Sequence, residues 1–151
     1  MQYLAICEDD LLFQFMRNVA AEQREVRYLV PNEKVARAIK RRGGKAWHGD
    51  LLKEETYKKI KLQYVDQAIV FLRDAELQDR VCRLLRSLDK MVSIVSLTSE
   101  NNGHHKETPD PLLRHLQLSD IFEEFCASQL LDTLNVKKVE RIRSLFADGR
   151  K

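Results

Sequence analysis

Cysteine, proline and glycine are scarce in this chain, which contains only three, three and five of them among 151 residues. Cys7, Cys82 and Cys126 are far apart and lie in apolar stretches, which excludes a disulfide scaffold or a clustered zinc site and fits a reducing compartment. No apolar run approaches the roughly 20 residues of a membrane span, and the first residues do not resemble a signal peptide. We therefore expect a soluble, cytoplasmic protein that does not insert into membranes.

The composition is that of one globular domain, with 44% hydrophobic and 32% charged residues. The net charge of +3 is too small to predict nucleic-acid binding by itself. Basic residues gather in 33–63, which holds ten against four acids, whereas 119–134 holds four acids and no Lys or Arg. Solvated helix faces explain both segments, and a nucleic-acid patch that uses Trp47 and Tyr57 is an alternative.

Short apolar runs alternate with segments of helical periodicity over the first hundred residues. The expected strands are 3–7, 26–30, 45–47, 67–72 and 91–97, and the expected helices are 11–19, 33–42, 51–60 (with Asp50 or a neighbour as its cap) and 76–88. The fourth and fifth runs are the most apolar and β-branched, as central parallel strands are. The pattern predicts an α/β fold with a Rossmann-like, doubly wound parallel sheet of five to six strands.

A polar stretch with one glycine and two prolines follows the fifth run. We expect a sheet domain over 1–99, a linker over 100–111, and C-terminal helices over 112–151 that include Leu113 and Leu116 in an apolar stripe.

Polar residues stand where the predicted strands end, and ligands of open α/β sheets bind at those carboxyl ends. The candidate ligand-binding residues there are Glu8, Asp9, Asp10, Asn32, Gly49, Asp50, Arg73 and Thr98. We find no arrangement that predicts a catalytic site or a resident metal.

The order of Gly43-Gly44, Gly49-Asp50, a short helix and the apolar strand from Val65 to Phe71 resembles the TrkA N-terminal domain. That family provides the nucleotide-binding lobes of RCK (regulator of potassium conductance) domains, and the likeness extends from Tyr3 to about Thr98. The resemblance implies an NAD or adenine-nucleotide site in which Asp50 is the preserved ligand position.

The family's first strand normally leads into Gly-x-Gly-x-x-Gly, which lets a pyrophosphate approach the backbone. Here Glu8, Asp10 and Phe13 occupy the glycine positions. Their side chains are expected to fill the phosphate space, and two of them would repel an anion. The acid that usually ends the second strand is replaced by Val30, with Asn32 or Glu33 as possible substitutes. We therefore expect a degenerate site that disfavours NAD.

The acidic triplet Glu8, Asp9 and Asp10 has two other interpretations. It is similar to the start of a response-regulator receiver domain, in which Asp50 would be the phosphoacceptor and Thr98 and Lys106 the switch residues. It could also bind a divalent cation without phosphotransfer. A simpler interpretation is that these acids favour the N-terminus of the following helix.

The resemblance also implies partners, because such lobes act on an associated or fused channel, transporter or DHH-family phosphoesterase domain. It implies a homodimer, for which 120–125 and 136–146 are the candidate surfaces. We expect a non-catalytic regulatory domain with no nucleic-acid partner, and the alternatives are the nucleotide-binding domain of a DHH phosphoesterase or a receiver.

Overall fold

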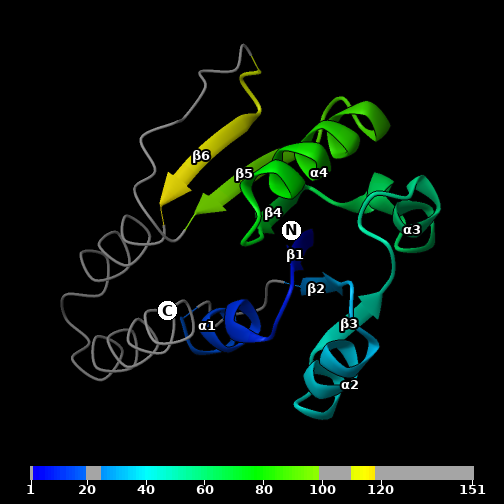
Figure 1. The fold of residues 1–151 in the computed structure, drawn as a ribbon, viewed down its shortest axis with the longest axis vertical. Helices are drawn as coiled ribbons and strands as arrows, with labels where there is room; N and C mark the ends of the chain where they lie inside the picture. Colours follow the sequence, from blue (N-terminus) through cyan, green and yellow to red (C-terminus); the bar gives the residue numbers. More distant parts are fainter. Residues whose placement is uncertain (1, 20–24, 99–109, 118–151) are drawn as a thin grey trace.

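The computed structural model describes residues 2–19, 25–98 and 110–117 (Figure 1). The strands are β1 (Gln2–Cys7), β2 (Glu25–Val30), β3 (Lys45–His48), β4 (Gln67–Phe71), β5 (Ser93–Thr98) and β6 (Leu113–Gln117). The helices are α1 (Leu11–Val19), α2 (Glu33–Arg41), α3 (Glu54–Lys59), the 3-10 turn η1 (Leu62–Tyr64) and α4 (Ala75–Leu88). In this part of the chain no helix is long and apolar enough to cross a membrane.

The six strands form one sheet in the order β3-β2-β1-β4-β5-β6, and every pair is parallel. β1 is central, with Ala5 opposite Tyr28 of β2 on one side and Ile69 of β4 on the other. The predicted Rossmann-like, doubly wound parallel sheet is confirmed.

Helices cover both faces of this sheet, as Figure 1 shows. α1 and α2 lie on one face, where Phe13, Phe15 and Ile39 join a buried cluster with residues of the strands. α3 and α4 lie on the other face, where Tyr57 and Leu85 join a second cluster. The β-branched runs of β4 and β5 are buried because they lie between these two layers.

The segment after Asp110 is the main error of the sequence analysis, because 112–117 was expected to be helical. Leu113–Gln117 is instead an edge strand, paired in parallel with Ile94–Thr98 of β5. The sheet therefore extends past the expected boundary at residue 99 and includes part of the predicted helical region. The remaining predicted helices, and most of the predicted linker, lie outside the described residues.

α2 has clear end signals. Asn32 is its N-cap, and the side-chain oxygen accepts a hydrogen bond from the N–H of Lys34 at 2.8 Å. At the other end, the N–H groups of Gly43 and Gly44 donate to the carbonyls of Lys40 and Ile39, both at 3.0 Å. Gly43 has a φ of +88°, so this pair of bonds is a Schellman motif with glycine in the left-handed position.

α3 begins later than expected, and Asp50 is not its cap. The N-cap residue is Lys53, whose side chain makes no capping hydrogen bond. The Asp50 carboxylate instead accepts from the N–H of Leu52 at 2.9 Å, within the turn that follows β3. The prediction of a helix over 51–60 was correct in place but too long at its N-terminus.

Arg86 joins the end of α4 to the start of β6. Its Nε lies 2.7 Å from an oxygen of Asp110, and its Nη1 donates to the carbonyls of Asp89 and Lys90 at 3.2 and 3.0 Å. Partial burial of Asp110 favours the neutral acid, but the hydrogen bonds from Arg86 and the N–H of Leu112, with the charge of Arg86, lower the pKa of this carboxyl. The edge strand is therefore anchored by an ion pair.

Candidate functional site

The carboxyl ends of the parallel strands meet at one edge of the sheet, so the candidate residues after β1 to β5 lie along the same rim. β1 and β4 are neighbours in the middle of the sheet, yet α1 and α4, which follow them, pack on opposite faces. The crevice between their N-termini is the topological switch point, where open α/β sheets bind ligands.

Residues of the chain itself bridge this crevice. Glu8, directly after β1, accepts a hydrogen bond from the backbone N–H of Arg73 at 3.1 Å. Asp9 pairs with the same residue, whose Nη2 lies 2.9 Å from Oδ2 of Asp9. Arg73 belongs to the loop between β4 and α4, so both bonds join the two loops that form the crevice.

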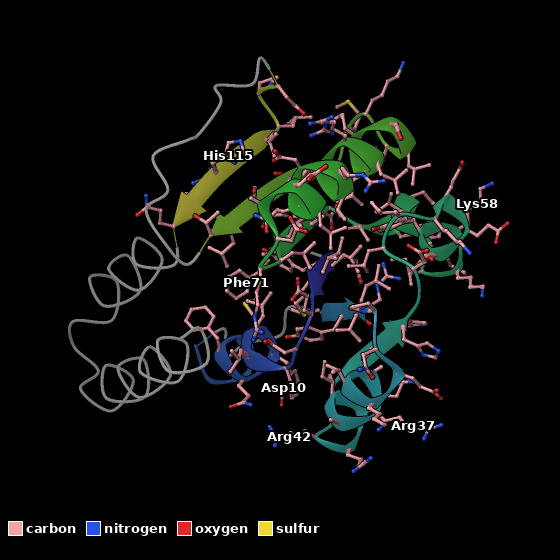
Figure 2. All side chains as sticks on the ribbon, viewed as in Figure 1. Asp10, Arg37, Arg42, Lys58, Phe71 and His115 are labelled. Carbon is pink, nitrogen blue, oxygen red and sulfur yellow. The ribbon has the colours of Figure 1, made fainter. Side chains whose placement is uncertain are left out.

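The acids also form hydrogen bonds with the first turn of α1. The second oxygen of Asp9 accepts from the N–H of Leu11 at 3.1 Å. Asp10 accepts from the side-chain amide of Gln14 at 3.1 Å, and its carboxylate lies 3.4 Å from Nη1 of Arg42, at the end of α2 (Figure 2). The interpretation that these acids favour the helix N-terminus agrees with this arrangement.

The other predicted residues have local roles in their own turns and helices. Asn32 caps α2, and Asp50 shapes its own turn. Gly49 packs against Thr56, since a Cβ on it would lie 2.9 Å from the methyl group of that residue. The hydroxyl of Thr98, at the end of β5, is buried and has no hydrogen-bond partner among the residues that the structure describes.

Phe13 departs from expectation, because its side chain does not fill the phosphate space. The ring is 5% exposed and lies in the core, edge-on to Tyr28 with ring centroids 5.2 Å apart. It also contacts Gly44, where an added Cβ would come within 2.7 Å of the ring. Only the carboxylates of the predicted substitutions lie at the rim.

Gln78 is a site residue that the sequence analysis missed. It is 3% exposed, and its oxygen accepts from the N–H of Leu72 at 2.7 Å. Its amide nitrogen donates to the hydroxyl of Ser96 at 2.7 Å and to the carbonyl of Leu97 at 3.1 Å. Gln78, on α4, therefore bonds both to β5 and to Leu72, the residue between the end of β4 and Arg73. The sequence did contain a signal for it. Gln78 precedes Val81, Cys82 and Leu85 by three, four and seven residues, which places it on the buried face of the helix.

Cys7 ends β1 directly before the acids, and its thiol is buried in the core. Burial raises its pKa, and the carboxylates of Asp9, Asp10 and Glu8 raise it further. The thiolate is the reactive form of cysteine, so the raised pKa disfavours Cys7 as a nucleophile. Tyr57 is also buried, with its hydroxyl donating to the carbonyl of Leu51, so the Trp47–Tyr57 stacking patch does not form.

The receiver interpretation is wrong. A receiver has the strand order 2-1-3-4-5, which places the phosphoacceptor strand beside β1. Here β2 lies between β1 and β3, so Asp50 stands at the sheet edge, away from the acidic triplet. Within the described residues, no three His, Cys, Asp or Glu side chains are grouped so that they could hold a metal ion.

Solved structures with the same fold include an NAD(P)-binding domain of an exopolyphosphatase-related protein from Archaeoglobus fulgidus. It is 15% identical, with a TM-score of 0.67, and the match covers 87% of this chain and 98% of that one. The TrkA-N domain of the inner membrane protein ybaL from Escherichia coli is 11% identical, with a TM-score of 0.66 and coverage of 85% and 96%. The human SLO3 gating ring is 13% identical, with a TM-score of 0.57 and coverage of 87% and 26%.

No curated protein matches this sequence closely enough to serve as a relative. The model of the TrkA-N domain family, however, matches residues 13–108, which is more than half of the chain. The order of strands, the switch-point crevice and this match lead to one conclusion: the chain belongs to the TrkA-N domain family.

Proposed function

We propose that this chain is a non-catalytic regulatory lobe whose dinucleotide site is degenerate, and that it acts on an associated effector domain in the cytoplasm. The observation that carries the proposal is the bridge across the crevice, in which Arg73 is bonded to both Glu8 and Asp9. In this proposal, the chain's own ion pair replaces a ligand in joining the two loops.

The bridge opposes a dinucleotide in two ways. First, it uses the donors that an anion needs, because Glu8 occupies the N–H of Arg73 and Asp9 occupies the N–H of Leu11. Second, the carboxylates would repel phosphate: two like charges 4 Å apart cost about 4 kcal/mol at an effective dielectric near 20. A diphosphate would also have to break the pair between Asp9 and Arg73.

The effector that we propose is a channel, a transporter or a phosphoesterase domain. Support comes from the neighbours, since one is a domain of an inner membrane protein and another is a gating ring. A lobe of this kind would influence its partner through its position and packing. We propose no nucleic-acid partner.

The phosphoesterase context is the second candidate, in which the chain is the nucleotide-binding domain of such an enzyme. It is favoured by the similarity to a domain from an exopolyphosphatase-related protein. The genomic reading frame that contains this sequence distinguishes it from a channel or transporter context.

The test is a thermal-shift and calorimetric panel of NAD, NADH, ATP, ADP and AMP, each with and without Mg²⁺. The wild-type chain should show no stabilisation by any nucleotide. The variant Glu8→Gln, Asp9→Asn removes the repulsion and should gain NAD affinity. Glu54→Gln, Glu55→Gln, on exposed side chains of α3, is the control with the same charge change away from the crevice.

Two results would contradict the proposal. If the wild-type chain binds NAD tightly, with a stabilisation of about 2.7 kcal/mol at a hundredfold excess over Kd, the site is not degenerate. If the neutralised variant gains no more affinity than the control, charge at the crevice is not what excludes the nucleotide.

A further inference from the structure

Two large apolar side chains are strongly exposed in the part of the chain that the structure describes, Tyr64 at 64% and Met91 at 78%. Tyr64 ends η1, shortly before β4, and Met91 precedes β5 by two residues. β4 and β5 are paired in parallel, with Gln67 opposite Ser93, and the carbonyl of Asp66 accepts from the N–H of Ser93 at 3.2 Å. Both exposed residues therefore lie at the amino ends of the same strand pair, at the opposite edge of the sheet from the crevice.

Four exposed lysines belong to the same end of the molecule. Lys58 and Lys59 end α3, Lys61 directly precedes η1, and Lys90 directly precedes Met91. Figure 1 shows α3 and the end of α4 on one side of the molecule, and Figure 2 shows the labelled Lys58 extending outward from α3. We call the four lysines and the two exposed apolar residues the amino-end patch.

The acids near this patch leave it positively charged. Lys58 pairs with Glu54 at 3.6 Å, a surface contact in which both side chains are more than half exposed. The other three lysines make no ion pair with any residue that the structure describes. Asp66 and Asp89 stand at the same end, where their carboxylates accept hydrogen bonds from backbone N–H groups at 2.7 and 2.8 Å. Four lysines thus exceed the three acids.

The helices give the whole molecule the same polarity. Each of α2, α3 and α4 has an acid in its first turn, toward the carboxyl ends of the strands, and at least one base in its last turn, toward the amino ends. The acids of the crevice add negative charge at the carboxyl edge. The electrostatic field of the described residues therefore favours an anionic partner at the amino edge.

Lys61 is held in a backbone conformation that disfavours lysine. Its φ of 54° and ψ of 62° are left-handed, and it is the single residue with positive φ other than glycine among the described residues. It follows the end of α3, and its N–H donates to the carbonyl of Lys58 at 3.2 Å. Helices usually place glycine at such a position, because a Cβ opposes this conformation. The lysine is thus kept at a cost in stability, as residues at functional sites often are.

The composition of the amino-end patch favours a membrane surface over other anionic partners. All four bases are lysines, whereas arginine is the usual base for bidentate contacts with nucleic-acid phosphates and protein carboxylates. Lysine clusters attract the anionic headgroups of a bilayer, and lysine stems and tyrosine rings lie well at the boundary between headgroups and acyl chains. An exposed methionine gains nothing on a phosphate backbone, but it is removed from water when it enters that boundary.

We propose that the amino-end patch docks this chain on the surface of an anionic phospholipid bilayer. Tyr64 and Met91 enter the headgroup layer, and the lysines contact the negatively charged groups of the lipids. The contact is peripheral and needs no membrane-spanning segment. It directs the acidic rim of the crevice away from the bilayer. This inference goes beyond the proposed regulatory function and does not depend on whether the crevice binds a nucleotide.

Co-flotation of the full chain with lipid vesicles tests the contact. The anionic vesicles contain about 30% phosphatidylserine in phosphatidylcholine, and vesicles of phosphatidylcholine alone are the comparison. The wild-type chain should bind the anionic vesicles and not the neutral ones. Binding should weaken between about 0.1 M and about 1 M salt, where the Debye length falls from about 10 Å to about 3 Å.

A lysine variant and a matched control measure the part played by charge, after circular dichroism shows that each is folded. The lysine variant is Lys59→Gln, Lys61→Gln, Lys90→Gln, and the control, at exposed positions away from the patch, is Lys34→Gln, Arg37→Gln, Lys53→Gln. At about fivefold for each lysine, the lysine variant should weaken binding to the anionic vesicles roughly a hundredfold. The control carries the same change in net charge and should weaken binding by less than about fivefold.

The apolar residues are tested separately. Tyr64→Ser, Met91→Ser should weaken binding roughly tenfold, whereas Tyr64→Trp, Met91→Leu should keep it, because these side chains also enter the headgroup layer. Lys61→Gly separates binding from folding: relief of the left-handed backbone should leave Tm unchanged or higher, while binding falls about fivefold.

The proposal is overturned if the wild-type chain does not bind anionic vesicles, or if it binds neutral vesicles equally well. It is also overturned if the control weakens binding as much as the lysine variant does, or if the serine variant binds like the wild type. Lysine-dependent binding of random-sequence duplex DNA, without binding of vesicles, would overturn it by assigning the patch to nucleic acid.

Discussion

Replacing Gln78 with leucine should lower the free energy of unfolding far more than the same replacement at an exposed glutamine. The side chain is 3% exposed and bonds to three groups, two on β5 and one on Leu72, the residue that follows β4. In the leucine variant, the N–H of Leu72 loses its acceptor, and an unsatisfied buried donor costs about 1–3 kcal/mol. Losing the amide donor to Ser96 and Leu97 adds about 0.5–1.5 kcal/mol.

The expected loss in the free energy of unfolding is therefore about 1.5–4.5 kcal/mol. Urea unfolding measures this loss. The m-value should not change if the variant exposes the same surface area on unfolding as the wild type. Ser96→Ala should cost less, about 0.5–1.5 kcal/mol, since the Gln78 amide keeps its bond to the carbonyl of Leu97. Gln63→Leu, at an exposed position, is the control and should stay within about 0.5 kcal/mol of wild type.

The reasoning fails if Gln78→Leu is as stable as the Gln63 control, because the three hydrogen bonds would then contribute nothing. The outcome also bears on the crevice. Gln78 holds the N–H of Leu72 directly before Arg73, so it positions the residue that bridges Glu8 and Asp9.

Three further outcomes follow from the packing and the charges. Gly44→Ala should lower the free energy of unfolding by about 1–3 kcal/mol, because the new Cβ would lie within 2.7 Å of two side chains and overpack the core. Gly43→Ala should lower it by about 1 kcal/mol, because only the positive φ opposes the new side chain. Urea unfolding compares the two variants. Arg86→Met should lower Tm at neutral pH. Because the pKa of Asp110 is lowered in the folded chain, this deficit should persist above about pH 4, the ordinary carboxyl range, and shrink as the pH falls through the folded value. Cys7 should resist iodoacetamide in the native chain at pH 8 and react after unfolding, as peptide mapping by mass spectrometry would show.

Local sequence determined much of the fold. The β-branched runs of β4 and β5 required burial on both sides, and this led directly to a parallel sheet covered by helices. The ends of α2 were also encoded locally, by Asn32 and by the glycine pair that follows the helix. These signals depend on neighbours within a few residues, which a sequence displays directly.

Only the tertiary structure decided the identity of β6 and the state of the crevice. Leu113 and Leu116 have a helical spacing, but five residues are too few for periodicity to separate a helix from a strand, and pairing with β5 decides for the strand. Likewise, Glu8 and Arg73 are 65 positions apart, and they meet because β1 and β4 are neighbours in the sheet. Whether a carboxylate at the rim repels a ligand or binds an arginine depends on which strand lies beside it, and that is a property of the whole fold.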